Sequence, residues 1–121
     1  MTDYFFDTYA IIEILNGNPA YDSYADANFV FTKLNFFELY YHLLKTQETA
    51  TATYFLQNYA PFIADFDERV VILAAEFRFA YKKQDLSMTD CIGYILAQQL
   101  GIPFLTGDNK FADKPGVKFV K

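Results

Sequence analysis

One stretch of the sequence carries most of the information about the fold: SMTDCIGYILAQQLGIPFLTGDNKF, residues 87–111. Its first part predicts a helix over residues 87–101, with Gly101 as the C-terminal stop. Four apolar side chains recur on one face of this helix: Ile92, Ile95, Leu96 and Leu100. The apolar run IPFL that follows predicts a short buried strand. The stretch therefore predicts a helix that leads into a strand, which is the repeating unit of an α/β fold.

A polar turn directly follows that strand. Thr106, Gly107, Asp108 and Asn109 succeed the IPFL run, and Gly, Asp and Asn tolerate the backbone angles that a turn demands. Asp108 is therefore interpreted first as a turn residue. Because it stands at the end of a predicted strand, it is also a candidate for a functional site.

The rest of the chain alternates strands and helices in the same way. Strands are expected at residues 4–6, 29–31, 61–66, 102–105 and 117–120. Helices are expected at residues 8–15, 20–27, 47–58 and 67–83, and a long one capped by Thr32 runs through Lys45. The alternation predicts an α/β domain with a mostly parallel sheet, whose ligands bind at the carboxyl ends of the strands.

Length and composition are those of one globular domain spanning residues 1–121. Hydrophobic residues make up 53% of the chain, enough for a sizeable core, and no repeat or linker divides it. The single cysteine, Cys91, excludes an internal disulfide and a multi-cysteine zinc site. No apolar run is long enough to span a membrane, and acids stand where a signal peptide would carry cations. We therefore expect a soluble, cytoplasmic protein.

Aromatic content and charge narrow the range of partners. Phe and Tyr supply an aromatic content of 20%, which predicts an aromatic core and an oligomer interface, with a homodimer as the expected state. The net charge of −5 argues against a general phosphate-binding surface. It does not exclude a nucleic-acid enzyme whose acids hold a divalent cation. Four lysines make residues 110–121 locally positive: Lys110, Lys114, Lys118 and Lys121.

Four acidic residues are candidates for a site: Asp7 after the first strand, Glu38 within a helix, Asp90 near a helix start, and Asp108. Asp7 has an alternative role as the N-cap of the helix that it precedes. Asp90 has one as the partner of Ser87 in a capping box. Each of these structural roles is common for its residue type, and both alternatives stay open at this point.

Glu38 is harder to explain structurally. It is the only acid in LNFFELYYHLL, which predicts a helix that is apolar all round and carries one buried carboxylate. Burial would raise the pKa of that carboxylate unless a cation or hydrogen-bond donors compensated. The only histidine, His42, lies one turn later and is interpreted as a packed or surface residue outside the site.

A set of carboxylates favours one kind of chemistry. Oxygen ligands suit magnesium or manganese, and such an ion activates water and stabilises the charge of a phosphodiester under attack. The sequence lacks the glycine-rich phosphate loop, the GxSxG elbow and the HExxH motif of competing enzyme classes.

Taken in order, four segments of the chain resemble the PIN-domain family, particularly the VapC-type toxins of toxin–antitoxin pairs: FFDTYAIIEIL, LNFFELYYHLL, LSMTDCIGYILAQQLGIPFLTGDNKF and PGVKFV. The residues that match the family's motifs are Asp7 with Thr8, Glu38, Asp90, and Thr106 with Asp108 and Phe111. The sequence departs from the pattern at Gly107, where Arg is frequent in relatives.

The resemblance implies an α/β/α sandwich with a central parallel sheet and a divalent-metal-dependent ribonuclease. It also implies roles for the acids: Asp7, Glu38, Asp90 and Asp108 would coordinate Mg²⁺ or Mn²⁺ and position the attacking water. Thr8 and Thr106 would orient carboxylates or the substrate phosphate. The implied partners are an RNA substrate and a small antitoxin with a basic segment.

Two other functions remain to be weighed. The fold can serve as a catalytically weak or inactive interaction module, although all four acids are present here. A phosphohydrolase of the haloacid dehalogenase type also begins with a strand and an Asp. Its motif requires a second Asp two residues later, where this chain has Tyr9.

Overall fold

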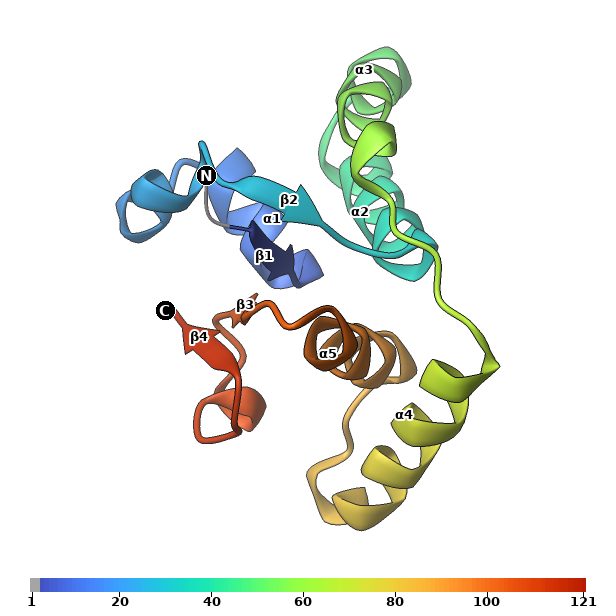
Figure 1. Ribbon diagram of the computed structural model, residues 1–121. Helices are drawn as coiled ribbons and strands as arrows, with labels where there is room; N and C mark the ends of the chain where they lie inside the picture. The colour runs from blue at the N-terminus through green and yellow to red at the C-terminus, as the bar shows by residue number, and fades with distance from the viewer. Residues whose placement is uncertain (1–2) are drawn as a thin grey trace.

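A central parallel sheet organises the molecule in the computed structural model, which describes residues 3–121. Its four strands lie in the order β2-β1-β3-β4 (Figure 1). They are β1 (Asp3–Phe6), β2 (Asn28–Val30), β3 (Phe104–Thr106) and β4 (Val117–Phe119). All three neighbouring pairs are parallel. The chain moves from β1 outward to β2 and then returns to the other side of β1, so the order switches between β1 and β3.

Helices flank the sheet and complete an α/β/α sandwich. They are α1 (Thr8–Leu15), α2 (Lys33–Thr46), α3 (Thr49–Tyr59), α4 (Glu68–Ala80) and α5 (Met88–Leu100). Short 3₁₀ helices are η1 (Pro19–Tyr24), η2 (Ala60–Phe62), η3 (Lys82–Gln84) and η4 (Asn109–Phe111). Both α1 and α5 contact β1 and β3, while α3 packs on α2 and α4 packs on α5 (Figure 1). Across the part of the chain that is described, every helix is too short or too polar to cross a membrane.

Aromatic side chains fill the core on both faces of β1. Phe5 stacks on Phe104 of β3 at 5.6 Å between ring centroids, and α5 crosses this pair at Gly93. A Cβ atom at Gly93 would lie 2.7 Å from the Phe5 ring, so the close approach of helix and sheet requires glycine there. Because successive strand residues face opposite ways, Phe6 points to the other face and stacks on Phe29 at 3.8 Å.

Three local predictions were wrong. Residues 61–66 are not a strand: Pro61 lies in η2, and only Ile63 forms an isolated parallel bridge, to Phe31. Proline fixes φ and has no N–H to donate to a ladder, which favours the turn. The helix expected over residues 20–27 is the shorter 3₁₀ helix η1. On α5, Leu100 is 48% exposed, while the other three residues of the predicted apolar face are buried.

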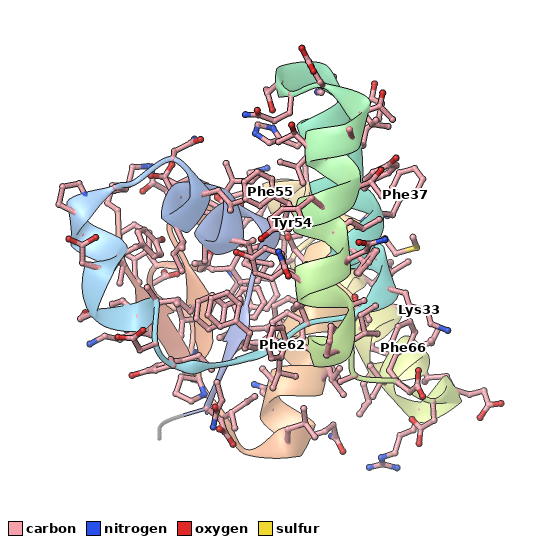
Figure 2. All side chains as sticks on the ribbon, turned by 90° about the horizontal axis from the view of Figure 1, so that it is seen from above. Lys33, Phe37, Tyr54, Phe55, Phe62 and Phe66 are labelled. Atoms are coloured by element: carbon pink, nitrogen blue, oxygen red, sulfur yellow. The ribbon has the colours of Figure 1, made fainter. Side chains whose placement is uncertain are left out.

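Both α2 and α3 carry exposed aromatic side chains. Figure 2 shows α3 lying beside α2, with Phe37 on the outer side of α2. Phe37 is 71% exposed, Tyr54 is 64% exposed and Tyr41 is 57% exposed. The fold therefore buries only part of the apolar surface of α2, and much of its aromatic surface faces solvent.

Candidate active site

The four acids predicted from the sequence line one pocket of about 380 Å³. Asp7 follows β1 and Asp108 follows β3, so the pocket lies at the carboxyl ends of the two strands between which the chain order switches. The complete lining is Asp7, Thr8, Tyr9, Glu38, Ser87, Asp90, Gly107, Asp108, Asn109 and Lys121. His42 is not among these residues.

Asp7 occupies the N-cap position of α1, but its side chain makes no capping hydrogen bond. Instead, Thr106 Oγ1 donates to Asp7 Oδ2 at 2.6 Å. The same hydroxyl accepts a hydrogen bond from the Asp108 amide at 3.1 Å. The capping role considered for the Asp7 side chain is therefore wrong. Thr106, which is fully buried, fixes the Asp7 carboxylate and the start of the Asp108 turn together.

Asp90 lies in the first turn of α5, and Ser87 is the residue that caps this helix. Ser87 Oγ accepts a hydrogen bond from the Asp90 amide at 3.1 Å. Because Ser87 satisfies the free amide, the Asp90 carboxylate is not needed as a cap and faces the pocket. Ser87 thus caps the helix, and both Ser87 and Asp90 line the pocket.

Burial and mutual repulsion raise the pKa values of two of the acids. The Asp7 side chain is only 3% exposed, and its pKa is raised well above its ordinary value by burial first and by the nearby Asp90 carboxylate second. Burial also raises the pKa of Asp90, as do Glu38 and Asp108, while hydrogen bonding from Asp7 and Ser87 offsets part of the effect. The pocket therefore gathers negative charge that is costly without a compensating cation.

Glu38 is half-buried, which corrects the prediction of a buried carboxylate. Its Oε1 accepts a hydrogen bond from Thr8 Oγ1 at 2.8 Å. Thr8 in turn accepts from Asn35 Nδ2 at 3.1 Å, and Asn35 takes part in the capping box with Thr32 at the start of α2. The cap of α2 thereby connects to α1 through Thr8 and holds Glu38 at the pocket.

Asp108 is a turn residue as predicted and also lines the pocket. It occupies the N-cap position of η4, where its Oδ1 accepts a hydrogen bond from the Lys110 amide at 3.0 Å. One oxygen is engaged in the turn, and the carboxylate still borders the pocket beside the other acids.

Five pocket residues were not predicted from the sequence as site residues: Tyr9, Ser87, Gly107, Asn109 and Lys121. A Cβ atom at Gly107 would lie 2.2 Å from Tyr9 Cε1 and 2.6 Å from the Val120 carbonyl oxygen. Tyr9 therefore packs directly over Gly107. The glycine in an otherwise matching Thr-x-Asp motif was the one signal in the sequence that pointed to this close contact.

We expect Gly107→Ala to lower the free energy of unfolding by about 1–3 kcal/mol, because the added methyl group overpacks a buried position. Urea unfolding of the purified variant and of the wild type measures this difference in the free energy of unfolding. Combining it with Tyr9→Ala should restore only part of the loss, since the Val120 backbone contact remains. An alanine variant as stable as the wild type would contradict the packing.

The donor chemistry of the pocket fits a small divalent cation. Within residues 3–121, no group of three acidic, histidine or cysteine side chains is already arranged to hold a metal ion. Mg²⁺ commonly keeps several waters and is held by only one or two carboxylates, so it does not require such a cage. The adjacent carboxylates of Asp7 and Asp90 carry raised pKa values, and both supply the oxygen ligands that Mg²⁺ or Mn²⁺ prefers.

A parallel α/β sandwich with acids at its switch point defines a class of α/β proteins whose ligands bind at the carboxyl ends of the strands. Comparison of the sequence with protein families identifies the member of this class: the PIN domain family matches residues 4–117, and the chain belongs to it. No curated protein matches the sequence.

Three solved structures share the fold. A toxin–antitoxin complex from Klebsiella pneumoniae aligns with a TM-score of 0.76 and 21% identity over 95% of each chain. VapBC2 from Rickettsia felis, bound to a DNA fragment from its promoter, aligns with a TM-score of 0.74 and 16% identity over 99% of this chain and 100% of the other. VapBC-1 from nontypeable Haemophilus influenzae gives a TM-score of 0.73 and 15% identity over 98% and 96%.

Proposed function

We propose that this PIN domain is a divalent-metal-dependent endoribonuclease that hydrolyses RNA phosphodiester bonds. The observation that carries the proposal is the pair Asp7 and Asp90: two neighbouring carboxylates with raised pKa values that face one pocket at the switch point of a parallel sheet. Such a pair is poorly stabilised alone and well suited to a cation. Glu38 and Asp108 add carboxylates on the same pocket.

In this proposal the protein's part is to bind, orient and position. Asp7 and Asp90 would hold Mg²⁺ or Mn²⁺, which supplies a polarised phosphate and a water of lowered pKa. Thr106 orients Asp7 through its 2.6 Å hydrogen bond, and Thr8 orients Glu38 through its 2.8 Å hydrogen bond. Glu38 and Asp108 then lie at the edge of the pocket, where they can accept hydrogen bonds from the attacking water.

We further propose that the protein is the toxin of a toxin–antitoxin pair and acts on RNA in the cytoplasm. The structures that share its fold are described as complexes of toxins with antitoxins. The exposed aromatic side chains on α2 and α3 are the kind of surface that a protein partner or a second copy covers. An antitoxin segment with basic side chains would complement both the net charge of −5 and the acidic pocket.

The deciding experiment is cleavage of a labelled cellular RNA pool in Mg²⁺ or Mn²⁺ by the purified, partner-free protein. We expect cutting that a chelator abolishes and that Asp90→Asn reduces by about a thousandfold, because the substitution removes a carboxylate from the cation site. Asp26→Asn, an exposed aspartate outside the pocket, is the matched control and should cut normally.

Two results would contradict the nuclease. One is cutting that survives both the chelator and Asp90→Asn, which would indicate a contaminant. The other is wild-type protein that neither cuts RNA nor binds Mn²⁺ in calorimetry. That second result would favour an interaction module, whose function would then depend on the exposed aromatic surface of α2 and α3.

A further inference from the structure

We propose that Lys121 is the side chain that binds a phosphate of the RNA substrate at this pocket. The inference rests on the proposed nuclease function and concerns how a polyanion enters an acidic site. Four carboxylates line the pocket, and a phosphodiester brought next to them is repelled unless cations lie nearby. A bound metal ion offsets part of this charge, and a fixed lysine at the rim would offset more and hold the strand in register.

The other lysines of residues 110–121 do not line the pocket. Lys110 Nζ donates to the Asp85 carbonyl at 3.3 Å. Lys114 is 6% exposed, and its Nζ donates to Gln84 Oε1 and to the Lys110 carbonyl, each at 2.6 Å. It also lies 4.5 Å from the centre of the Tyr81 ring, which makes it a structural cation.

Lys118 is exposed and lines a separate groove that includes Gly101 and Ile102, at the C-terminal end of α5. Lys121 is the lysine that lines the acidic pocket. Of the four lysines in residues 110–121, Lys121 alone places its positive charge at the pocket.

The backbone beside Lys121 is fixed next to the pocket. The Val120 amide donates to the Thr106 carbonyl at 2.9 Å, which extends the pairing of β4 with β3. The Tyr21 hydroxyl donates to the Val120 carbonyl. Thr106 is the residue that fixes Asp7, so the backbone that carries Lys121 is joined directly to the acidic site.

The Lys121 side chain keeps capacity for a ligand. Its Nζ donates to the Gly107 carbonyl at 3.5 Å, a long contact that engages one of three ammonium donors. Gly107 itself has no room for a side chain beneath Tyr9, so this turn position supplies no basic group of its own. The ammonium is exposed, cationic and placed at the rim of the pocket, which suits an RNA phosphate.

The test compares Lys121→Met with Lys118→Met, a matched removal of one exposed lysine from the same region. Anisotropy of a short labelled single-stranded RNA in Ca²⁺ gives Kd, and cleavage in Mn²⁺ gives kcat and KM. We expect Lys121→Met to weaken RNA binding about tenfold and to raise KM more than it lowers kcat. The slope of log K against log salt should become shallower by about 0.7, the value for one phosphate contact to a single strand.

Three further readouts decide the outcome. Lys121→Arg should restore most of the affinity for RNA, and the affinity for Mn²⁺ alone should not fall in Lys121→Met, because Lys121 is not a ligand of the cation and its removal takes away a positive charge beside the cation site. An active wild type whose salt slope is unchanged in Lys121→Met, or is changed equally in Lys118→Met, would overturn the role of Lys121 and leave the nuclease standing. A wild type that neither binds nor cuts RNA would overturn both.

Discussion

Asp7→Asn is expected to cut RNA at least about a thousandfold more slowly than the wild type, and to unfold at a higher temperature when no divalent cation is present. The first effect follows from the loss of a buried carboxylate at the proposed cation site. The second follows from the raised pKa of Asp7, which means that folding disfavours the charged form. An amide of the same shape carries no charge and can still accept the hydrogen bond from Thr106.

The sign of the stability effect fixes the pH range of this experiment. A raised folded-state pKa contributes stability that is fully present below the unfolded pKa, near 4, and is lost as the pH rises through the folded value. The gain from Asp7→Asn should therefore be largest at neutral pH and above, and should vanish in acid.

Thermal unfolding in chelator from acid to neutral pH measures this gain, and Mn²⁺ should stabilise the wild type but not the variant. Asp26→Asn, which removes an equal charge from the surface, controls for the change in net charge. If Asp7→Asn destabilised the cation-free protein at neutral pH, Asp7 would be a structural residue. The interpretation that its buried charge destabilises the folded protein would then be wrong.

Much of the site could be predicted because the carboxyl ends of parallel strands lie at the same edge of a sheet, which brings residues distant in the sequence together. Asp7 and Asp108 each follow a strand, and the carboxyl ends of parallel strands share one edge. Asp90 was a candidate as an acid near a helix start, and the structure shows that Ser87, three positions earlier, caps that helix. Each of these inferences needed only local sequence and the fold class.

Other features depend on packing between segments that no local pattern encodes. Glu38 appeared buried because its neighbours are apolar, yet α2 exposes Phe37 and Tyr41 on its outer side. The sequence shows that these side chains are apolar but not whether the fold covers them. Residues 61–66 have the composition of a strand, but only Ile63 forms a β-bridge, and its partner is Phe31. Strand formation depends on that partner more than on the residues themselves.

Lys121 and Tyr9 were not predicted as pocket residues because they too reach the pocket through packing between distant segments. Tyr9 meets Gly107 across nearly the whole chain, and Lys121 reaches the pocket only because Val120 pairs with Thr106. Lysine clusters in a sequence are usually solvated surface. Only the contacts distinguish Lys114, a buried structural cation, from Lys121 at the rim of the site.

The second large effect is on pH dependence. At a Mn²⁺ concentration below saturation, RNA cleavage should rise by up to about two log units per pH unit, because the protons of Asp7 and Asp90 compete with the cation for the same oxygens. Carboxylates of ordinary pKa, near 4, would already be ionised at pH 5.5 and would give a flat profile. Because both pKa values are raised, the rise should lie at higher pH than it would for ordinary carboxylates, and it should level off only when both groups are ionised.

Ionisation of the attacking water also increases a rate with pH, so the rate alone does not identify the titrating groups. The affinity for Mn²⁺ separates the two causes. Competition at Asp7 and Asp90 predicts that the affinity, measured by calorimetry, increases over the same pH range as the rate and that saturating Mn²⁺ shifts the rate profile to lower pH. Ionisation of water predicts a rising rate at constant affinity. An affinity that does not change over the pH range in which the rate rises would mean that Asp7 and Asp90 are not the groups that hold the cation.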